Sequence, residues 1–374
     1  MNIQPFLVEE WMNAWEEKAR YNIAETCCDS ISLETLFDLA GEDLQAFFSG
    51  LSRRRLTYGA IEGRPDFLEG ICGLYDTLRP DEVIPTHGAA GANHLLFYSL
   101  VEPGDEVICV QPTYQQLYGI PAGYGARVRL LQLREEDGWL PDPDALRALV
   151  TPATRLICLN NPNNPTGALM DGAQLKDIVG IARSCGAWIL CDEVYRHLTQ
   201  EDCRIPSVAD LYERGISVSG MSKVFSLAGL RLGWIASHDA ALRKACMSHR
   251  DYSLISCGML DEAVAAVALR HADQLLRRNR ELIRSNLRTL EAWIKRMDGL
   301  ISHVTPRAGT TSLLRYTPEL DSYTFARRLL EETGAFLTPG DCFGRPGTLR
   351  IGYACDGETL RGGLDALGCF LRSL

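Results

Sequence analysis

The chain has 374 residues, 46% of them hydrophobic, so it is long and apolar enough to bury a sizeable core and to form about two domains. Its net charge of −10 provides no basic stripe, which argues against nucleic acid and an anionic membrane surface as partners. The thirteen cysteines are scattered without metal-ligand spacing, and the sequence shows no signal peptide or membrane-spanning run. These features predict a cytoplasmic protein with reduced thiols and no bound metal.

The first forty residues are predicted to form an N-terminal segment, residues 1–40, that also contributes to a smaller domain. Apolar residues at helical spacing predict a short helix within residues 6–15. An extended stretch is expected over residues 22–29, in which the adjacent Cys27 and Cys28 are interpreted as small packed side chains. Ser32 is a candidate N-cap for the next helix, and a further helix is predicted from about residue 66 to residue 78.

Short apolar strands then alternate with helices. The predicted strands cover residues 82–86, 106–110, 128–131, 155–159, 188–191, 216–219 and 233–236. Nearly continuous apolar strands separated by helices indicate an α/β fold with a mostly parallel sheet that is buried on both faces. This pattern predicts a large ligand-binding domain over residues 41–285.

The last part of the chain has a different pattern. A charged amphipathic helix is predicted over residues 272–298, followed by strands near residues 311–316 and 348–353. These elements predict a smaller C-terminal α+β domain over residues 286–374. Since the sequence contains no long linker, we expect the two domains to share an interface.

A lysine among small residues is the first candidate for chemistry. Lys223 follows the small residues Gly220 and Ser222, and the apolar Phe225 is expected to desolvate its amine. Desolvation lowers the pKa of an amine, so that a neutral lysine can condense with an aldehyde. Arg231, eight positions later, offers a planar fork of donors that suits a phosphate. The run therefore suggests a phosphorylated aldehyde cofactor, although a solvated lysine and an ordinary ion pair would also explain it.

Further motifs follow predicted strands, at the edge where open parallel sheets bind ligands. Residues 87–92, His-Gly-Ala-Ala-Gly-Ala, open a helix whose free backbone amides suit a phosphate. In residues 160–167 two prolines hold the amide of Asn164, and after the next strand Asp192 precedes Tyr195 by three residues. Such an acid could hold a protonated pyridine nitrogen while the phenol reaches the adjacent ring oxygen. A plain turn and a structural acid are the simpler alternatives.

Three motifs in this order and spacing resemble those of the class I/II aminotransferases, and the resemblance covers nearly the whole chain. They are Asn-Pro-Asn-Asn-Pro-Thr-Gly, Asp-Glu-Val-Tyr, and Ser-Lys with an arginine eight residues later. These aminotransferases are fold type I enzymes that depend on pyridoxal 5'-phosphate (PLP), so the resemblance implies PLP as cofactor and a homodimer. It also implies that the protein acts on an L-amino acid through an external aldimine, with Lys223 moving the Cα proton and Asp192 pairing with the pyridine nitrogen.

The resemblance implies roles for the remaining motif residues. They are Ala89, Ala90, Ser222 and Arg231 for the phosphate, Asn164 and Tyr195 for the phenolic oxygen, Tyr114 for stacking on the ring, Arg350 with Asn164 for the substrate, and Tyr58 from a second subunit. Gly220 and Ala90 depart from the family pattern, because hydroxyl side chains are frequent at both positions. No second arginine is evident for a distal carboxylate, which disfavours aspartate or glutamate as the amino donor.

The N-terminal segment resembles, more loosely, the capreomycidine-synthase branch of this superfamily. The similar stretches are residues 9–12, 21–30, 58–60 and 112–118. This resemblance implies a cyclase that eliminates water from a hydroxylated arginine and closes the guanidine into a ring. Glu9 or Glu25 could then supply the carboxylate that a guanidinium needs. Alternatively, Glu9 and Glu10 form the solvated face of a helix, and the enzyme is an aminotransferase that moves an amino group to a 2-oxo acid.

A binding protein is the alternative from another class. Aminotransferase-like domains also serve as effector-binding parts of transcription regulators, which carry a basic helix-turn-helix extension, and we expect no room for one before Tyr21. An inactive cofactor binder is disfavoured because Lys223, Asp192 and Arg350 are all present. The sequence therefore predicts an enzyme.

Overall fold

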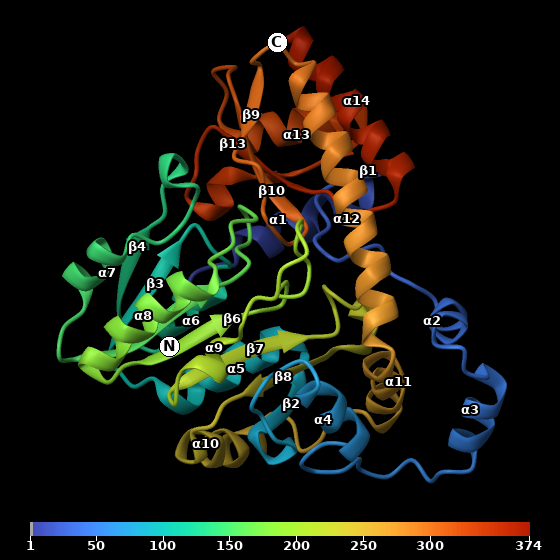
Figure 1. Ribbon diagram of the computed structural model, residues 1–374. Helices are drawn as coiled ribbons and strands as arrows, with labels where there is room; N and C mark the ends of the chain where they lie inside the picture. Colours follow the sequence, from blue (N-terminus) through green and yellow to red (C-terminus); the bar gives the residue numbers. More distant parts are fainter. Residues whose placement is uncertain (1–2) are drawn as a thin grey trace.

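The computed structural model describes residues 3–374, and a seven-stranded sheet forms the centre of its larger part (Figure 1). The strand order is β2-β8-β7-β6-β5-β3-β4. The bounds are β2 Val83–His87, β3 Glu106–Gln111, β4 Arg127–Gln132, β5 Thr154–Asn160, β6 Trp188–Asp192, β7 Gly215–Gly220 and β8 Leu232–Ala236. β8 runs antiparallel to both of its neighbours and the other pairs are parallel, which confirms the predicted mostly parallel α/β sheet.

Both faces of this sheet are covered by helices because successive side chains of its central strands, which point to opposite faces, are largely apolar. In β5, Leu156 and Cys158 pack on one side, whereas Ile157 and Leu159 pack on the other. The first side carries α5 Gly88–Leu100, α6 Gln116–Gly123 and α10 Ala240–Arg250, and the second carries α7 Pro143–Leu149, α8 Gly172–Cys185 and α9 Val208–Leu211. No helix in residues 3–374 is long and apolar enough to cross a membrane.

The smaller part combines the C-terminal residues with the start of the chain. Its antiparallel sheet has the order β12-β13-β10-β9, with β9 Ile301–His303, β10 Thr311–Tyr316, β12 Thr338–Pro339 and β13 Thr348–Gly352. A parallel pair joins β1 Tyr21–Asn22 to β11 Ala335–Phe336, and the helices are α13 Ser322–Thr333 and α14 Gly357–Ser373. α12 Ala272–Lys295 links the two parts (Figure 1), so the domain boundary proposed at residue 285 falls within a continuous helix. The domain limits stay a prediction.

The N-terminal helices largely match expectation. α1 is Leu7–Trp15, and Ser32 caps α2 Leu33–Ala40 by accepting a hydrogen bond of 3.1 Å from the Thr35 amide. The other helices are α3 Leu44–Ser52, α4 Pro65–Cys72 and α11 Met259–Arg270, with 3-10 turns η1 Glu16–Lys18, η2 Pro80–Glu82, η3 Glu135–Asp137, η4 Ala228–Leu230 and η5 Gly340–Phe343.

The helix expected over residues 66–78 is shorter than predicted. It ends at Cys72, because Gly73 follows and the chain tightens into turns in which the Leu74 and Tyr75 amides bond three residues back. Leu74, Tyr75 and Leu78 are still buried, so the apolar pattern that predicted the helix extends past the end of the helix.

Gly233 of β8 lies where the sheet and the start of α5 come closest, since a Cβ atom there would overlap the backbone of Gly88 and Ala89. We expect Gly233→Ala to lower the free energy of unfolding by about 1–3 kcal/mol, as overpacking does, in urea denaturation. Gly229→Ala is the matched control, because its Cβ would meet no atom within 4 Å. Equal losses in the two variants would contradict the steric argument.

Candidate active site

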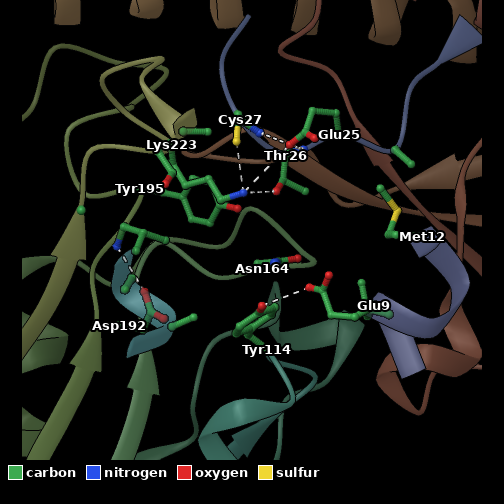
Figure 2. A pocket seen from close by; sticks show the side chains of 18 of the residues that line it. Glu9, Met12, Glu25, Thr26, Cys27, Tyr114, Asn164, Asp192, Tyr195 and Lys223 are labelled. Atoms are coloured by element: carbon green, nitrogen blue, oxygen red, sulfur yellow. Dashed lines mark hydrogen bonds and ion pairs between the residues drawn. The ribbon is translucent and has the colours of Figure 1, made fainter. Parts of the chain in front are cut away.

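A cavity of about 300 Å³ opens where the carboxyl ends of the parallel strands meet the start of α5 and the N-terminal segment (Figure 2). β2 and β7 both end at this edge because each is antiparallel to β8 between them. All but one of the predicted site residues line this cavity: Glu9, Glu25, Ala89, Ala90, Tyr114, Asn164, Asp192, Tyr195, Ser222, Lys223, Arg231 and Arg350. Motifs far apart in the sequence are therefore brought together.

Tyr58 is the exception. Its side chain is 71% exposed and lines a separate cavity of about 620 Å³ with Gly59, Met259 and Glu262. Tyr58 is thus not placed in the cavity of its own chain, and its role across a subunit interface stays a prediction.

The start of α5 forms one end of the cavity. Gly88 adopts a left-handed φ of +66°, which lets the chain turn from β2 directly into the helix. Ala89 and Ala90 follow with backbone amides at the helix N-terminus, and Arg231 lies against Gly88. Gly220 has no room for the more frequent serine, because a Cβ atom there would lie 2.9 Å from the Leu232 carbonyl oxygen.

Lys223 projects into the middle of the cavity, where its side chain is 26% exposed. Its Nζ atom donates hydrogen bonds to Thr26 Oγ1 at 2.7 Å and to Cys27 Sγ at 3.3 Å, and lies 4.0 Å from Glu25 Oε1. Burial lowers the pKa of this amine, but Cys27, Tyr195 and Glu25 together raise the pKa above its usual range. The expectation of a lowered pKa, drawn from the sequence neighbours, was wrong.

Asp192 is a buried acid at the end of β6. Its Oδ2 accepts a hydrogen bond of 3.2 Å from Asn93 Nδ2, and its Oδ1 accepts one of 3.2 Å from the Val194 amide. Burial raises the pKa of Asp192 to about 6, although the Asn93 hydrogen bond opposes the rise. Asp192 forms no ion pair with any residue the structure describes, so this carboxylate can accept a cation from a ligand.

Two further cavity-lining side chains each hold a buried polar atom that has no hydrogen-bond partner among the described residues. The buried Tyr195 hydroxyl has no hydrogen-bond partner among residues 3–374. Arg350 donates from Nη2 to the Ala24 carbonyl and Thr338 Oγ1, both at 3.0 Å, and from Nη1 to Asn164 Oδ1 at 3.3 Å. Its Nε has no partner in the same part of the chain. A bound anion and a ring oxygen would satisfy these donors.

Helix α1 forms the opposite wall. Val8, Glu9, Met12, Asn13 and Glu16, spaced along one face of α1 and its continuation, line the cavity. Gln115 anchors the start of the helix, because its side chain accepts from the Leu7 amide at 2.9 Å and donates to the Pro5 carbonyl at 2.7 Å.

Glu9 is held at the cavity by a partner on the other wall: Tyr114 donates its hydroxyl hydrogen to Glu9 Oε1 at 3.1 Å (Figure 2). Glu10 is exposed and does not line the cavity. Glu9 is exposed as well, as the solvated-face alternative expected, but it differs from Glu10 in lining the cavity and in accepting the Tyr114 hydrogen bond.

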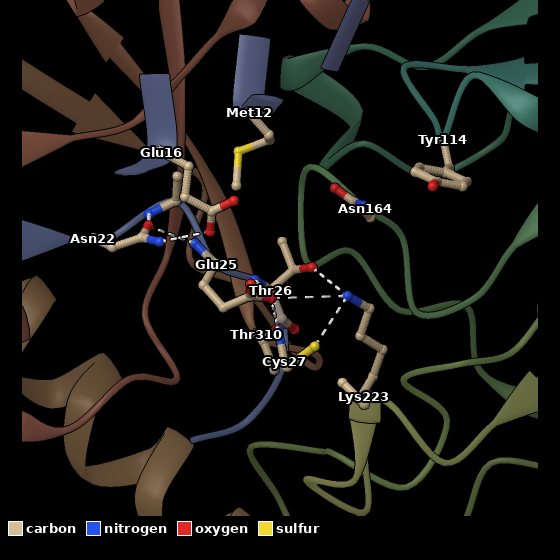
Figure 3. Close-up of polar contacts among 12 residues, drawn as sticks. Met12, Glu16, Asn22, Glu25, Thr26, Cys27, Tyr114, Asn164, Lys223 and Thr310 are labelled. Carbon is tan, nitrogen blue, oxygen red and sulfur yellow. Dashed lines mark hydrogen bonds and ion pairs between the residues drawn. The ribbon is translucent and has the colours of Figure 1, made fainter. Parts of the chain in front are cut away.

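Glu25 lines the cavity next to Lys223 (Figure 3), with 4.0 Å between its Oε1 and the lysine Nζ. Its Oε1 accepts hydrogen bonds from the Thr26 amide at 2.7 Å and the Cys27 amide at 2.8 Å. Burial would raise the pKa of Glu25, but Lys223 and the Cys27 amide hold the pKa below its usual range. Glu25 is therefore a fixed carboxylate.

A third carboxylate, Glu16, completes what we call the acidic wall, namely Glu9, Glu16 and Glu25. Asn22 Nδ2 donates to Glu16 Oε1 at 2.8 Å (Figure 3). Each of the three carboxylates is thus held through Oε1, and the Oε2 atoms accept no hydrogen bond from the described residues.

Sequence reasoning missed Glu16, Thr26, Cys27 and Asn93. Asn93 could have been found, since it stands four residues after Ala89 and so shares its helix face. Cys28 is fully buried as expected, whereas the Cys27 thiol faces the lysine amine. No local signal marks Thr26 or Cys27, because they reach Lys223 only when the N-terminal segment folds back.

Comparison with known proteins places this cavity in a family. The model of the family "Aminotransferase class I and II" matches residues 35–367. Capreomycidine synthase of Streptomyces vinaceus is 35% identical over 286 residues, which cover 76% of this chain and 73% of that protein. An aspartate aminotransferase of Pyrococcus horikoshii is 29% identical over 352 residues, which cover 89% of this chain and 88% of that protein.

Solved structures agree with this placement. A PLP-dependent aminotransferase from Streptococcus suis has 44% identity and a TM-score of 0.96, over 100% of this chain and 99% of that chain. The PLP-dependent cyclase OrfR has 27% identity and a TM-score of 0.92, over 100% of this chain and 98% of that chain. The family match covers most of the chain and the fold agrees along its whole length, so the protein belongs to the class I and II aminotransferase family and is an enzyme of the fold type I superfamily.

Proposed function

We propose that this enzyme is a PLP-dependent cyclase that eliminates water from a hydroxylated arginine and closes the guanidine into a ring. The observation that carries the proposal is the acidic wall, which presents three fixed carboxylates to the cavity. Similarity to capreomycidine synthase and to the cyclase OrfR supports it.

The cofactor of this family is PLP, and the residues of the cavity fit it. The α5 amides of Ala89 and Ala90, together with Arg231, would hold the phosphate, and Lys223 would bind the aldehyde. Asp192, buried without a cation, suits the protonated pyridine nitrogen. When bound, PLP draws electrons away from the substrate Cα.

The chain's own residues would orient the substrate and move its proton. Arg350, which lines the cavity and pairs with no carboxylate in the described chain, would bind the substrate α-carboxylate. The open Tyr195 hydroxyl, with Asn164, would bind the ring oxygen. The Lys223 amine would take the proton from Cα and return it later. Each group is fixed before the substrate enters, so little reorganisation is needed.

The acidic wall determines the substrate class in this proposal. A guanidinium carries five N–H donors, and the free Oε2 atoms of Glu9, Glu16 and Glu25 offer matching acceptors. Lys223, Arg231 and Arg350 are the cations that line the cavity in the described chain, and each already has another role. A cationic side chain therefore complements the wall, whereas a dicarboxylate would meet three negative charges without an arginine of its own.

An aminotransferase is the second candidate. Lys223, Asp192 and Arg350 would serve that reaction equally well, and two relatives with that name are similar over 89% and 100% of the chain. The acidic wall disfavours aspartate as the donor but not a basic amino acid. The two candidates thus share a substrate class and differ in the fate of the amino group.

We also propose a cytoplasmic homodimer. Its support is the family resemblance together with the exposure of Tyr58, which would complete the phosphate site of a second subunit.

Carboxylate removal tests the substrate class. Glu9→Gln, Glu16→Gln and Glu25→Gln are each expected to weaken binding of a guanidino amino acid by about 1–3 kcal/mol, since a charge-assisted hydrogen bond is lost, and to leave binding of alanine nearly unchanged. Spectroscopic titration of the holoenzyme measures both affinities. Glu10→Gln is the matched control on the exposed face of α1. Equal losses for both amino acids would remove the case for a guanidinium pocket.

Product analysis separates the two reactions. Near-stoichiometric holoenzyme is mixed with arginine or its hydroxylated forms, without a 2-oxo acid, and examined by mass spectrometry. A cyclase leaves the cofactor as PLP while a hydroxyarginine loses one water. Accumulation of pyridoxamine phosphate with a 2-oxo acid product would instead establish transamination and end the cyclase proposal. Lys223→Ala should give neither result.

Ionised Asp192 is expected to lower the free energy of unfolding of the apoenzyme at neutral pH. Its pKa is about 6 in the folded state, above the unfolded value near 4, so stability is lost as pH rises through this window. Asp192→Asn cannot ionise and should raise the free energy of unfolding of the apoenzyme by about 2–3 kcal/mol at pH ~7.5 but by only about 1 kcal/mol at pH ~4.5. Urea denaturation at both pH values measures the difference. The same change at both would show that ionisation is not its cause.

A further inference from the structure

The closest polar contact of the Lys223 amine is with the N-terminal segment, not with the strands that carry the rest of the site. Nζ donates to Thr26 Oγ1 at 2.7 Å and to Cys27 Sγ at 3.3 Å (Figure 3). A hydroxyl oxygen is a good acceptor and a thiol sulfur a weak one, so Thr26 makes the stronger contact. Burial also raises the pKa of the Cys27 thiol.

Thr26 is fixed from several directions. Its carbonyl accepts a hydrogen bond of 2.7 Å from Thr310 Oγ1, and its amide donates one of 2.7 Å to Glu25 Oε1. Two residues on, the Cys28 amide donates to the Lys223 carbonyl at 3.3 Å, which ties the segment to the lysine backbone. The hydroxyl is therefore held at a defined place relative to the amine.

Lys223 has two tasks, holding the cofactor and moving the Cα proton, and it performs the second as a free amine. When the neutral amine takes the proton, it becomes an ammonium ion with three N–H donors in a partly desolvated cavity. Such an ion needs acceptors, and a long flexible side chain needs one that fixes its direction. In the structure the free amine already points at Thr26.

We propose that Thr26 is the positioning residue for this proton transfer: its hydroxyl holds the free Lys223 amine against the N-terminal wall, beside Glu25 and the substrate. The proposal rests on Lys223 as the proton carrier and holds for a cyclase and an aminotransferase alike, since both move the Cα proton. Its failure is thus distinct from that of the substrate assignment.

Thr26→Val tests the proposal, because valine has nearly the same shape as threonine but lacks the hydroxyl. In Thr26→Val apoenzyme, the pKa of Lys223 should fall by about one unit, because a hydrogen bond to the charged amine is lost. The readout is the pH dependence of Lys223 labelling by an amine reagent, quantified by mass spectrometry. The titratable groups that face the amine, and that the variant leaves in place, are Glu25, Cys27, Tyr114, Asp192 and Tyr195.

In the holoenzyme, exchange of the Cα proton of arginine and of alanine with deuterated solvent measures the proton transfer whatever the later reaction. Its maximal rate should fall about tenfold in Thr26→Val, with half-saturation changed less than twofold, which corresponds to about 1.4 kcal/mol in the transition state. Thr26→Ser should restore both the rate and the pKa. Cys27→Ala, which removes the weaker acceptor, should have a smaller effect.

A Thr26→Val enzyme with unchanged pKa and exchange rate would overturn the proposal, as would a Thr26→Ser enzyme as impaired as Thr26→Val. Thermal unfolding of each variant checks that the fold is intact. If Thr26→Val does not fold, Thr26→Ala replaces it in the same comparison with Thr26→Ser.

Discussion

Residues 22–29 pass between strand β13 and the loop that carries Lys223, and backbone hydrogen bonds hold them on both sides. The Gly352 amide bonds to the Ile23 carbonyl at 2.8 Å, and the Cys28 amide bonds to the Lys223 carbonyl at 3.3 Å. Gly352 must be a glycine here, because any Cβ atom would overlap the Glu25 carbonyl. This passage joins the small sheet, the lysine and Arg350, which donates to the Ala24 carbonyl, into one rigid frame. Without it the cavity would lose Glu25 from the acidic wall and the backbone contact that holds Arg350.

The frame separates charge within a small volume. The helix N-terminus and Arg231 make one end of the cavity suitable for an anion, whereas the acidic wall makes the other end suitable for a cation. Asp192 and Lys223 lie between the two ends and have raised pKa values, each for a different cause: burial for the acid and surrounding acidic groups for the amine. A molecule with a phosphate-bearing partner at one end and a basic side chain at the other fits this division.

The sequence predicted the large sheet well because its strands depend on local apolar runs, and it predicted the motif residues because each motif directly follows such a strand. Properties set by distant neighbours could not be predicted. The pKa of Lys223 is raised by Cys27 and Glu25, which stand almost two hundred residues earlier and whose approach depends on how the N-terminal segment folds back. Glu16 gave no signal for the same reason. The length of α4 was also predicted wrongly, because buried apolar residues follow the helix after its end and an apolar pattern alone does not mark where a helix stops.

The location of Glu9, Met12 and Glu16 on one face of α1 and of η1, which continues it, has an evolutionary consequence. In the proposed function the cofactor would be held by residues at the strand ends of the sheet, whereas much of the acidic wall comes from α1 and the turn after it. Point changes along this one helical stripe can alter the side chain that is accepted and leave the catalytic core untouched. Enzymes that share such a core could therefore diverge in substrate through their first twenty residues, and a transplanted N-terminal helix offers a compact route to redirecting the enzyme.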